Sequence, residues 1–306
     1  MAATTGPSAL APLFILGAPR SGTSLLYKVL CLHSGVAYIS NWMRRAPRVP
    51  ALALANRVAA RFPDLRRTVW FGGDAGNAYV YGDRRSLPTR LFPMPVEGEP
   101  LFRSCGLGPG PQSGPPEPAQ IVCVQQTFAA LRRYAGADFV ISKRIASNQR
   151  IPLLAAAFPG ARFVNLIRDG RAVAYSLSRV AWWEDGPVWW LGATPREWRE
   201  RGGDPWELCA RHWMHELASV DEGLRSVPPG QQVEIRYEEL VEHPVATLRQ
   251  VATFAGLPDD RRWTAELARL HFPNRNEAWR EQLPADVRER VSTVQYEQLR
   301  RLRYDS

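Results

Sequence analysis

The chain has 306 residues, of which 45% are hydrophobic and 23% charged, and this composition is typical of a folded globular protein. Its uninterrupted apolar runs are short, such as residues 13–16, and none approaches the roughly 18 residues of a membrane-spanning helix. We therefore expect no transmembrane segment. The formal net charge of +9 favours an anionic partner, such as a nucleotide, a nucleic acid or a membrane surface, without choosing among them.

The beginning of the chain and its cysteines bear on the compartment. Residues 1–11 are predicted to be a flexible N-terminus. They do not resemble a secretory signal, because no basic segment followed by an apolar core is present. The four cysteines are widely spaced and form no CxxC pair: Cys31, Cys105, Cys123 and Cys209. Such usage is typical of a reduced, cytoplasmic protein.

The first half of the chain contains one long irregular stretch between regular elements. Residues 70–118 are predicted to be mostly loop, and eight prolines between 93 and 118 indicate a lid or an insertion rather than core. The regular elements are a strand over 11–17 and helices around 25–30, 47–62 and 121–134.

Strands and helices alternate in the second half. Strands are predicted over 138–142, 161–167 and 232–236, and helices over 151–158, 171–179, 205–224, 244–255, 259–270 and 285–303. Strands separated by helices indicate a parallel sheet with helices on both faces. We predict one α/β domain over 1–306, with three layers and a central parallel sheet of four to five strands.

The residues after the first strand have the spacing of a phosphate-binding loop, GxxxxGK[ST]. The sequence there is Gly17-Ala18-Pro19-Arg20-Ser21-Gly22-Thr23-Ser24. Thr23 replaces the lysine that reaches the outer phosphates in nucleoside triphosphatases, whereas Arg20 places a positive charge inside the loop. Backbone N–H groups and hydroxyls can still bind an anion there. The pattern therefore indicates a P-loop-like fold and disfavours ATP or GTP hydrolysis.

This loop resembles the 5′-phosphosulfate loop of the sulfotransferases that use 3′-phosphoadenosine 5′-phosphosulfate (PAPS). The family pattern P-[KR]-[SA]-G-T-[TS] is matched, in the arginine version typical of bacterial and membrane-associated branches, by Pro19, Arg20, Ser21, Gly22, Thr23 and Ser24. The resemblance implies that these residues bind PAPS and that Arg20 contacts the transferred sulfuryl group or its bridging oxygen. Fixed donors would offset the charge developing there, so no metal is expected.

A second motif follows the strand over 161–167. Arg168-Asp169-Gly170-Arg171, with Ser176 eight residues after the first arginine, resembles the family's 3′-phosphate signature. Arg168 leaves the carboxyl end of a strand, where open α/β sheets bind ligands, and an arginine with a hydroxyl suits a phosphate. A surface Arg–Asp pair beside a helix serine is the alternative for this motif alone. The two motifs together, in the family's order, favour the nucleotide site.

Later segments resemble further landmarks of the family. Residues 235–244 match its strand end with a tyrosine, which implies that Tyr237 lies near the adenine. Residues 274–280 occupy the place of a segment that often closes over the 3′-phosphate, and Arg275 is the candidate contact there.

Sulfuryl transfer also needs a cation near the transferred group and a base for the acceptor's proton. Lys143 follows the strand over 138–142, where the family places a supporting lysine. The family's usual bases are missing, since Ile145 stands at the histidine position and Ser40 and Asn41 stand near the glutamate position. We choose Glu97 as the base, because a loop carboxylate facing the sheet edge could be desolvated. The other candidates are Asp74, Glu99, His33 and His212.

The acceptor side is predicted from aromatic residues. Seven of the eleven tryptophans lie between 182 and 213, among glycines and prolines. We expect this segment and residues 93–118 to cover the acceptor, a small-molecule, glycoside or lipid-like alcohol.

The leading hypothesis is thus a PAPS-dependent sulfotransferase that yields adenosine 3′,5′-bisphosphate. The alternatives are a P-loop kinase or NTPase, against which Thr23 argues, and a non-catalytic nucleotide-binding protein, which depends on the positive charge alone. No nucleic-acid partner is expected because no base-reading motif is present. A homodimer is left open.

Overall fold

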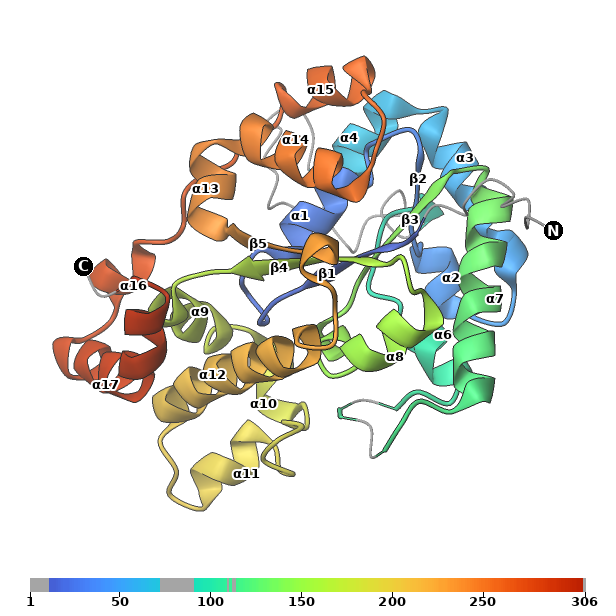
Figure 1. Cartoon of the computed structure of the whole chain (residues 1–306). Helices are drawn as coiled ribbons and strands as arrows, with labels where there is room; N and C mark the ends of the chain where they lie inside the picture. The colour runs from blue at the N-terminus through green and yellow to red at the C-terminus, as the bar shows by residue number, and fades with distance from the viewer. Residues whose placement is uncertain (1–10, 72–90, 109, 112–113, 305–306) are drawn as a thin grey trace.

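The protein is described by a computed structural model over residues 11–71, 91–108, 110–111 and 114–304 (Figure 1). The predicted flexible N-terminus therefore lies outside the described residues, except for Ala11. A five-stranded sheet has the order β2-β3-β1-β4-β5, and each neighbouring pair is parallel. The strands are β1 (Leu13–Leu16), β2 (Val36–Ala37), β3 (Phe139–Lys143), β4 (Arg162–Ile167) and β5 (Gln232–Arg236). The predicted α/β class with four to five parallel strands is confirmed.

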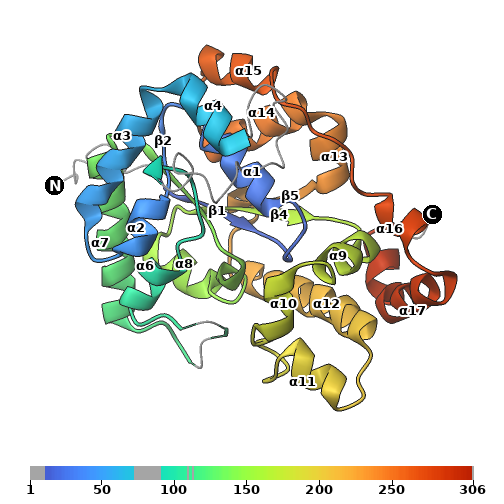
Figure 2. The same cartoon turned by 180° about the vertical axis from the view of Figure 1, so that it is seen from behind.

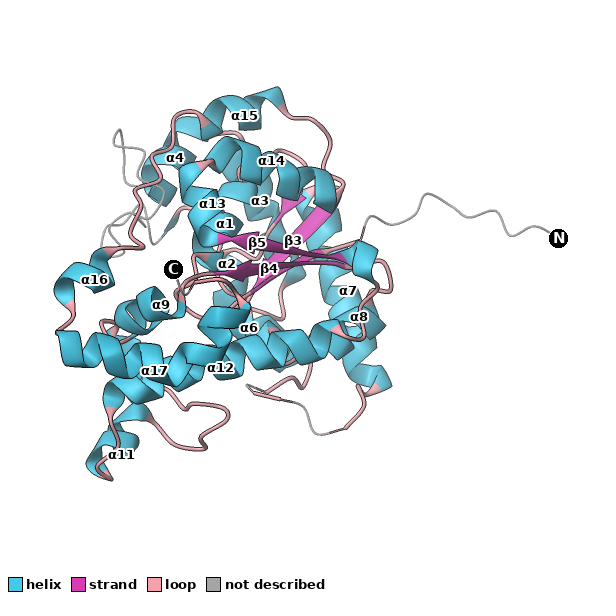
Figure 3. Ribbon diagram, turned by 60° about the vertical axis from the view of Figure 1, so that its left-hand side comes forward, coloured by secondary structure: helices cyan, strands magenta, loops and turns pink. Residues whose placement is uncertain are grey.

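Helices cover both faces of this sheet (Figures 1 and 3). One face is covered by α1 (Thr23–Leu30), α4 (Pro63–Phe71), α13 (Tyr237–Glu242), α14 (Pro244–Ala255) and α15 (Arg261–Leu267). The other face is covered by α6 (Glu99–Ser104), α7 (Pro118–Ala135), α8 (Ile151–Ala157) and α12 (Pro205–Leu224), with α2 (Asn41–Arg45), η1 (Pro50–Ala53) and α3 (Leu54–Ala60) at one end. The structure is therefore the predicted three-layer arrangement.

Strand β1 shows why two cores form. Leu13 and Ile15 belong to the core beneath α1 and α14, whereas Phe14 and Leu16 belong to the core beneath α7 and α8. Side chains alternate between the faces of a strand, so a central strand with apolar residues at every position supplies both layers.

A further group of helices extends the second layer at the carboxyl end of β4. It consists of α9 (Gly170–Leu177), α10 (Ala181–Asp185), α11 (Pro195–Glu200), α16 (Ala278–Gln282) and α17 (Ala285–Arg301), packed around α12 (Figure 2). The remaining elements are two short 3-10 turns, η2 (Ile145–Ser147) and η3 (Pro229–Gln231). Among the described residues, no helix has both the length and the apolarity needed to cross a membrane.

The prediction that residues 93–118 are lid or insertion rather than core is wrong for their first half. Helix α6 forms within it, and Leu101, Phe102 and Leu107 are buried in the core. Pro100 lies in the first turn of α6, where proline is tolerated because the N–H it lacks would have no helical partner. The many prolines therefore mark a helix start and tight turns as well as loop.

The expectation of reduced cysteines is also wrong. Cys105, after α6, forms a disulfide with Cys123 in α7, whereas Cys31 and Cys209 are free and buried. The spacing in the sequence could not show this pair, because packing of α6 against α7 brings the two Cα atoms to 5.5 Å. The disulfide removes the observation that pointed to a reducing compartment.

This cross-link should contribute measurably to stability. The bonded cysteines are 18 residues apart, and closing such a loop in the unfolded chain is worth about 3 kcal/mol. We expect the double variant Cys105→Ser/Cys123→Ser to lower the free energy of unfolding by roughly 2 to 3 kcal/mol in urea titrations. A thiol assay of the denatured wild type should find two reactive cysteines, and four would contradict the pairing.

Candidate active site

The loop after β1 has an unusual backbone that its sequence explains. Gly17 and Gly22 have φ angles of 138° and 91°, and Arg20 also lies in the left-handed region at 71°. A Cβ at Gly17 would lie 2.5 Å from the carbonyl oxygen of Leu166, and one at Gly22 would lie 2.6 Å from the ring of Tyr237. Glycine is therefore required at both positions. Arg20 is exposed, and it adopts a backbone conformation that non-glycine residues rarely take.

The other residues of the loop are arranged to bind an anion. Pro19, Ser21 and Thr23 are buried, and Ser24 is half-buried at the start of α1. The Oγ atom of Ser21 is buried and has no hydrogen-bond partner among the described residues. A buried hydroxyl without a partner costs free energy, so a ligand that satisfies it fits this loop.

Arg168 joins this loop to two other segments. Its guanidinium donates to the carbonyl oxygen of Arg20 (2.9 Å), to the carbonyl oxygen of Arg275 (2.8 Å) and to Oδ1 of Asn276 (3.1 Å). It also lies 4.2 Å from the ring centroid of Tyr237, a favourable cation–π distance. Arg168 is therefore held rigidly between the loop, β5 and the C-terminal segment.

The two predicted nucleotide motifs meet in space. Arg20 Nε donates to Ser176 Oγ at 3.0 Å, across 156 positions of sequence. Tyr237 is fully buried beneath Gly22 and Arg168, so it supports the loop from below. Arg275 is exposed, and its backbone carbonyl, together with Asn276, holds Arg168. Sequence reasoning missed Asn276, because an asparagine one position from a candidate arginine carries no signal of its own.

Lys143 and Glu97, predicted from different parts of the chain, form an ion pair at the end of β3. Lys143 Nζ also donates to Ser24 Oγ at 3.2 Å, which ties the pair to the loop. Arg144 bridges two carboxylates, pairing with Glu97 and, through Nε at 2.9 Å, with Glu99. No motif distinguishes Arg144 in the sequence, because it is one of 37 arginines when the two lysines are subtracted from the 39 basic residues.

This cluster sets the charge of Glu97. Burial opposes ionisation, but Lys143 and Arg144 outweigh it and lower the pKa of Glu97 to about 2. Burial likewise opposes ionisation of Glu99, and Arg150 and Arg144 lower its pKa below the ordinary value. Both carboxylates are therefore anionic at neutral pH.

A buried carboxylate lies behind the loop and was not among the predicted residues. Glu216 of α12 is fully buried and accepts from Asn148 Nδ2 (2.6 Å), Gln149 Nε2 (3.1 Å) and Trp189 Nε1 (2.8 Å). Asn148 in turn bonds both the N–H and the carbonyl of Gly17 at 3.1 Å. Burial raises the pKa of Glu216, although these donors oppose the rise. Trp189 is thus connected to the first residue of the loop through two side chains.

The two segments predicted to cover an acceptor do approach each other. A Cβ at Gly110, in the segment after α6, would lie 3.5 Å from the Cβ of Trp189. Trp190 stacks on His215 with ring centroids 4.0 Å apart, and Trp182 is exposed. Trp183 and Trp213 are buried, so they belong to the core and only part of the cluster can face a ligand.

The other candidate bases named from the sequence lie in different surroundings. His33 is buried away from the loop, where its Nε2 faces the carbonyl of Pro258 at 3.0 Å. Burial lowers the pKa of His212 to about 3, and its Nδ1 accepts from Trp190. Asp74 lies outside the described residues. No group of three or more potential metal-ligating His, Cys, Asp or Glu side chains occurs in the part of the chain that the structure describes.

A model of the family described as "Sulfotransferase family" matches residues 12–71 and 119–261, more than half of the chain. This chain belongs to that sulfotransferase family. The matched ranges contain the loop, Lys143, Arg168 and Tyr237. They leave out residues 72–118, which contain Glu97, and residues 262–306, which contain Arg275.

Individual relatives agree with this membership. A protein-tyrosine sulfotransferase of Drosophila melanogaster is 28% identical over 102 residues, which are 33% of this chain and 17% of that relative. Sulfotransferase STF9 from Mycobacterium avium aligns with a TM-score of 0.57 at 16% identity, over 95% of this chain and 76% of that one. The sulfotransferase domain from the curacin biosynthetic pathway aligns at 0.51 and 15%, over 94% and 96%. These structures share the fold of this chain.

The ion pairs of Glu97 should make the free energy of unfolding of this sulfotransferase depend on pH in the acidic range. A lowered pKa in the folded state stabilises the protein above the ordinary pKa of 4.5, and this contribution is lost as the pH falls towards about 2. We expect Glu97→Gln to be less stable than the wild type by roughly 1 to 3 kcal/mol at pH 6, with the difference shrinking between pH 4.5 and 2. Urea titrations at each pH measure it.

A matched control is Glu117→Gln, which replaces an exposed glutamate that forms no salt bridge with another described residue. Its difference from the wild type should stay near zero at every pH. A Glu97→Gln difference that is independent of pH would contradict the ion pairing.

Glu216 should contribute to stability, because the neighbouring groups all donate hydrogen bonds to its carboxylate. In Glu216→Gln, the new NH₂ group must face the N–H of Trp189 or the amides of Asn148 and Gln149, which leaves a buried donor without an acceptor. We expect a loss of about 1 to 3 kcal/mol in the free energy of unfolding. Glu222→Gln, at an exposed position of the same helix, should cost much less, and equal losses would contradict the network.

Proposed function

We propose that this protein transfers a sulfuryl group from PAPS to a hydroxyl group of a small-molecule, glycoside or lipid-like acceptor. The observation that carries the proposal is the hydrogen bond from Arg20 to Ser176, because it brings the 5′-phosphosulfate motif and the 3′-phosphate motif to one place. PAPS, when bound, supplies the sulfuryl group, whose bond to the 5′-phosphate oxygen breaks as a bond to the acceptor oxygen forms.

The donor side is assigned to the loop and its neighbours. We propose that the backbone and hydroxyls of residues 19–24 bind the 5′ end, with Ser21 Oγ gaining the partner it lacks. Arg168 and Ser176 would hold the 3′-phosphate, since Arg168 uses three of its five N–H groups on protein atoms and keeps the others. Arg275 would close over the same phosphate, and Tyr237 would lie nearest the adenine.

The acceptor side is assigned to the cluster at the end of β3. Arg20 and Lys143 would offset the charge that develops on the transferred group and on the leaving phosphate. Glu97, ionised at neutral pH, would accept the hydroxyl proton of the acceptor. A sulfuryl group beside Lys143 would share its ammonium with Glu97, which would raise the pKa of Glu97 and make it a stronger base.

Calorimetry with adenosine 3′,5′-bisphosphate and with ATP tests the donor. We expect binding of the bisphosphate and much weaker binding of ATP, because the loop lacks the lysine that reaches outer phosphates. Equal binding of ATP, together with magnesium-dependent ATP turnover, would replace the proposal by a kinase or NTPase. Binding without transfer of labelled sulfate to any alcohol in an acceptor screen would leave a nucleotide-binding protein.

Variants at Arg20 separate the role of its side chain in turnover from the effect of its backbone conformation on stability. Arg20→Ala should lower turnover with labelled PAPS by a factor of about 100 or more, while Arg168→Ala should chiefly weaken bisphosphate binding. Arg20→Gly should lose the same activity but be about 1 kcal/mol more stable than Arg20→Ala, because glycine adopts the left-handed conformation without strain.

The matched control is Arg303→Gly, at the other non-glycine residue with a positive φ among the described residues, 58°. It should gain stability over Arg303→Ala in the same way and keep full turnover. Retained turnover in Arg20→Ala would overturn the assignment of Arg20.

A further inference from the structure

Exposed apolar side chains gather on one surface of the molecule. In the described chain, five of the nine exposed large apolar residues lie within 17 positions: Val49, Leu54, Val58, Phe62 and Leu65, with 42–52% of their surface accessible. Leu54 and Val58 are one helical turn apart on α3, and Phe62 follows in the short connection between α3 and α4. All five side chains are exposed on these consecutive elements.

The same surface is strongly basic. Residues 41–63 contain five arginines, all exposed, and no aspartate or glutamate: Arg44, Arg45, Arg48, Arg57 and Arg61. Indeed, the first acidic residue of the whole chain is Asp64. We call these ten exposed apolar and arginine residues the α2–α4 surface. Its charge is a local property, because acidic residues offset most of the arginines elsewhere in the chain.

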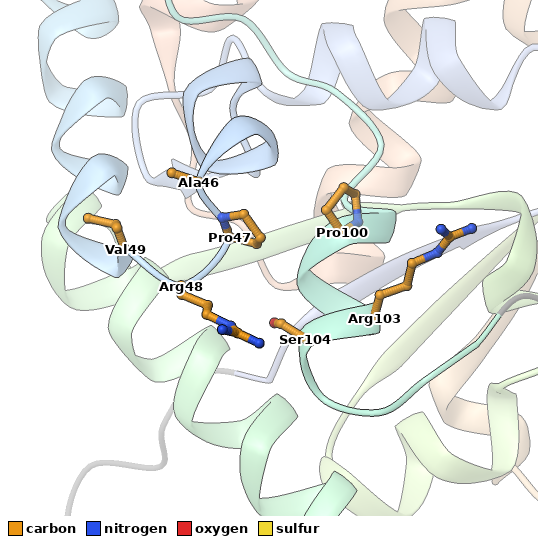
Figure 4. A pocket seen from close by; sticks show the side chains of 7 residues that line it. All are labelled: Ala46, Pro47, Arg48, Val49, Pro100, Arg103 and Ser104. Atoms are coloured by element: carbon orange, nitrogen blue, oxygen red, sulfur yellow. The ribbon is translucent and has the colours of Figure 1, made fainter.

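A hollow at the edge of the α2–α4 surface adds a recess for a charged group (Figure 4). It has a volume of about 520 Å³ and lies between the connection after α2 and helix α6. Arg48 and Val49 line one side, and Pro100 and Arg103 line the other. Arg48 thus places an exposed guanidinium beside apolar side chains, as an anionic head group next to acyl chains requires, whereas Arg103 also pairs with Glu99 at 3.6 Å.

We propose that the α2–α4 surface binds the surface of an anionic lipid bilayer. A stripe of aliphatic and aromatic side chains flanked by arginines is the pattern by which proteins lie on such membranes. A second copy of this chain is a poorer partner, because a two-fold interface would bring five arginines against the same five. A nucleic acid is poorer too, because four of the five apolar side chains are aliphatic and only Phe62 offers a ring on which a base could stack.

The location of the surface agrees with this proposal. Helices α2, α3 and α7 lie together at one end of the molecule, and α16 and α17 lie at the other (Figures 1 and 2). Helix α7 packs against α3 and contributes no acidic residue between 118 and 137, while Val122 on it is exposed. The neighbouring helix therefore extends the basic, apolar face.

Co-sedimentation of the full chain with vesicles tests the proposal. One set of vesicles is phosphatidylcholine, and the other is an equal mixture of phosphatidylcholine and phosphatidylglycerol. We expect binding to the anionic vesicles only, weakening as salt is added. Arg48→Gln/Arg61→Gln should weaken it roughly 10- to 30-fold, and Val58→Ser/Phe62→Ser should weaken it at least tenfold at unchanged net charge.

The matched control is Tyr296→Ser/Arg300→Gln on α17, which removes an exposed ring and an exposed arginine at the opposite end. It should bind vesicles like the wild type. All variants change exposed side chains, so their melting temperatures should match and a folding defect would be visible.

Each of the following results would overturn the proposal: equal binding to both vesicles, binding to neither, or a dimer in sedimentation equilibrium that Val58→Ser/Phe62→Ser dissolves. Binding to soluble polyglutamate in place of vesicles would identify an acidic polypeptide as the partner instead, and would overturn it too. Bisphosphate binding is measured without lipid, so failure here leaves the proposed sulfuryl transfer standing.

Discussion

The site depends on the guanidinium group of Arg168, which holds three segments of the chain together. It binds the backbone of Arg20 and of Arg275 and the side chain of Asn276, so the first, middle and last parts of the chain meet on one group. A guanidinium suits this task because its donors are planar, fixed and permanently charged. Since Arg168 leaves the end of β4 and rests on Tyr237 at the end of β5, the geometry of the loop is set by the sheet itself.

A second set of contacts fixes the segment that carries Glu97. Arg150 is fully buried and donates to both carboxylate oxygens of Glu99 and to the carbonyl of Gly108 at 2.6 Å. The disulfide attaches the same segment to α7. Glu97 is therefore presented by a segment that is fixed at several points, although it lies outside the ranges that match the family model. Lys143 joins this segment to the loop after β1, because its Nζ contacts Ser24 on one side and Glu97 on the other.

The sequence was sufficient to predict four of the five strands and the loop after β1, because those features are local. Apolar runs predicted β1, β3, β4 and β5, and the turn residues between 17 and 24 revealed the loop. The short strand β2, only Val36–Ala37, has no pattern long enough to detect. The remainder depends on distance in space. Asn148 and Glu216 became visible only when folding placed them behind Gly17, and the pairing of Cys105 with Cys123 appeared only when α6 packed on α7.

The order of the strands also has a consequence for how this chain acquires its structure during synthesis. The first strand made, β1, is the middle strand of the sheet, and the first of its two partners to follow, β3, begins 123 residues after β1 ends. At about 5 to 20 residues per second, a ribosome needs roughly 6 to 25 s to supply that partner. During this interval an apolar strand and the acid-free stretch that follows it have no sheet to join. The yield of folded protein would then depend on whether a chaperone binds these exposed segments early, rather than on the stability of the finished domain.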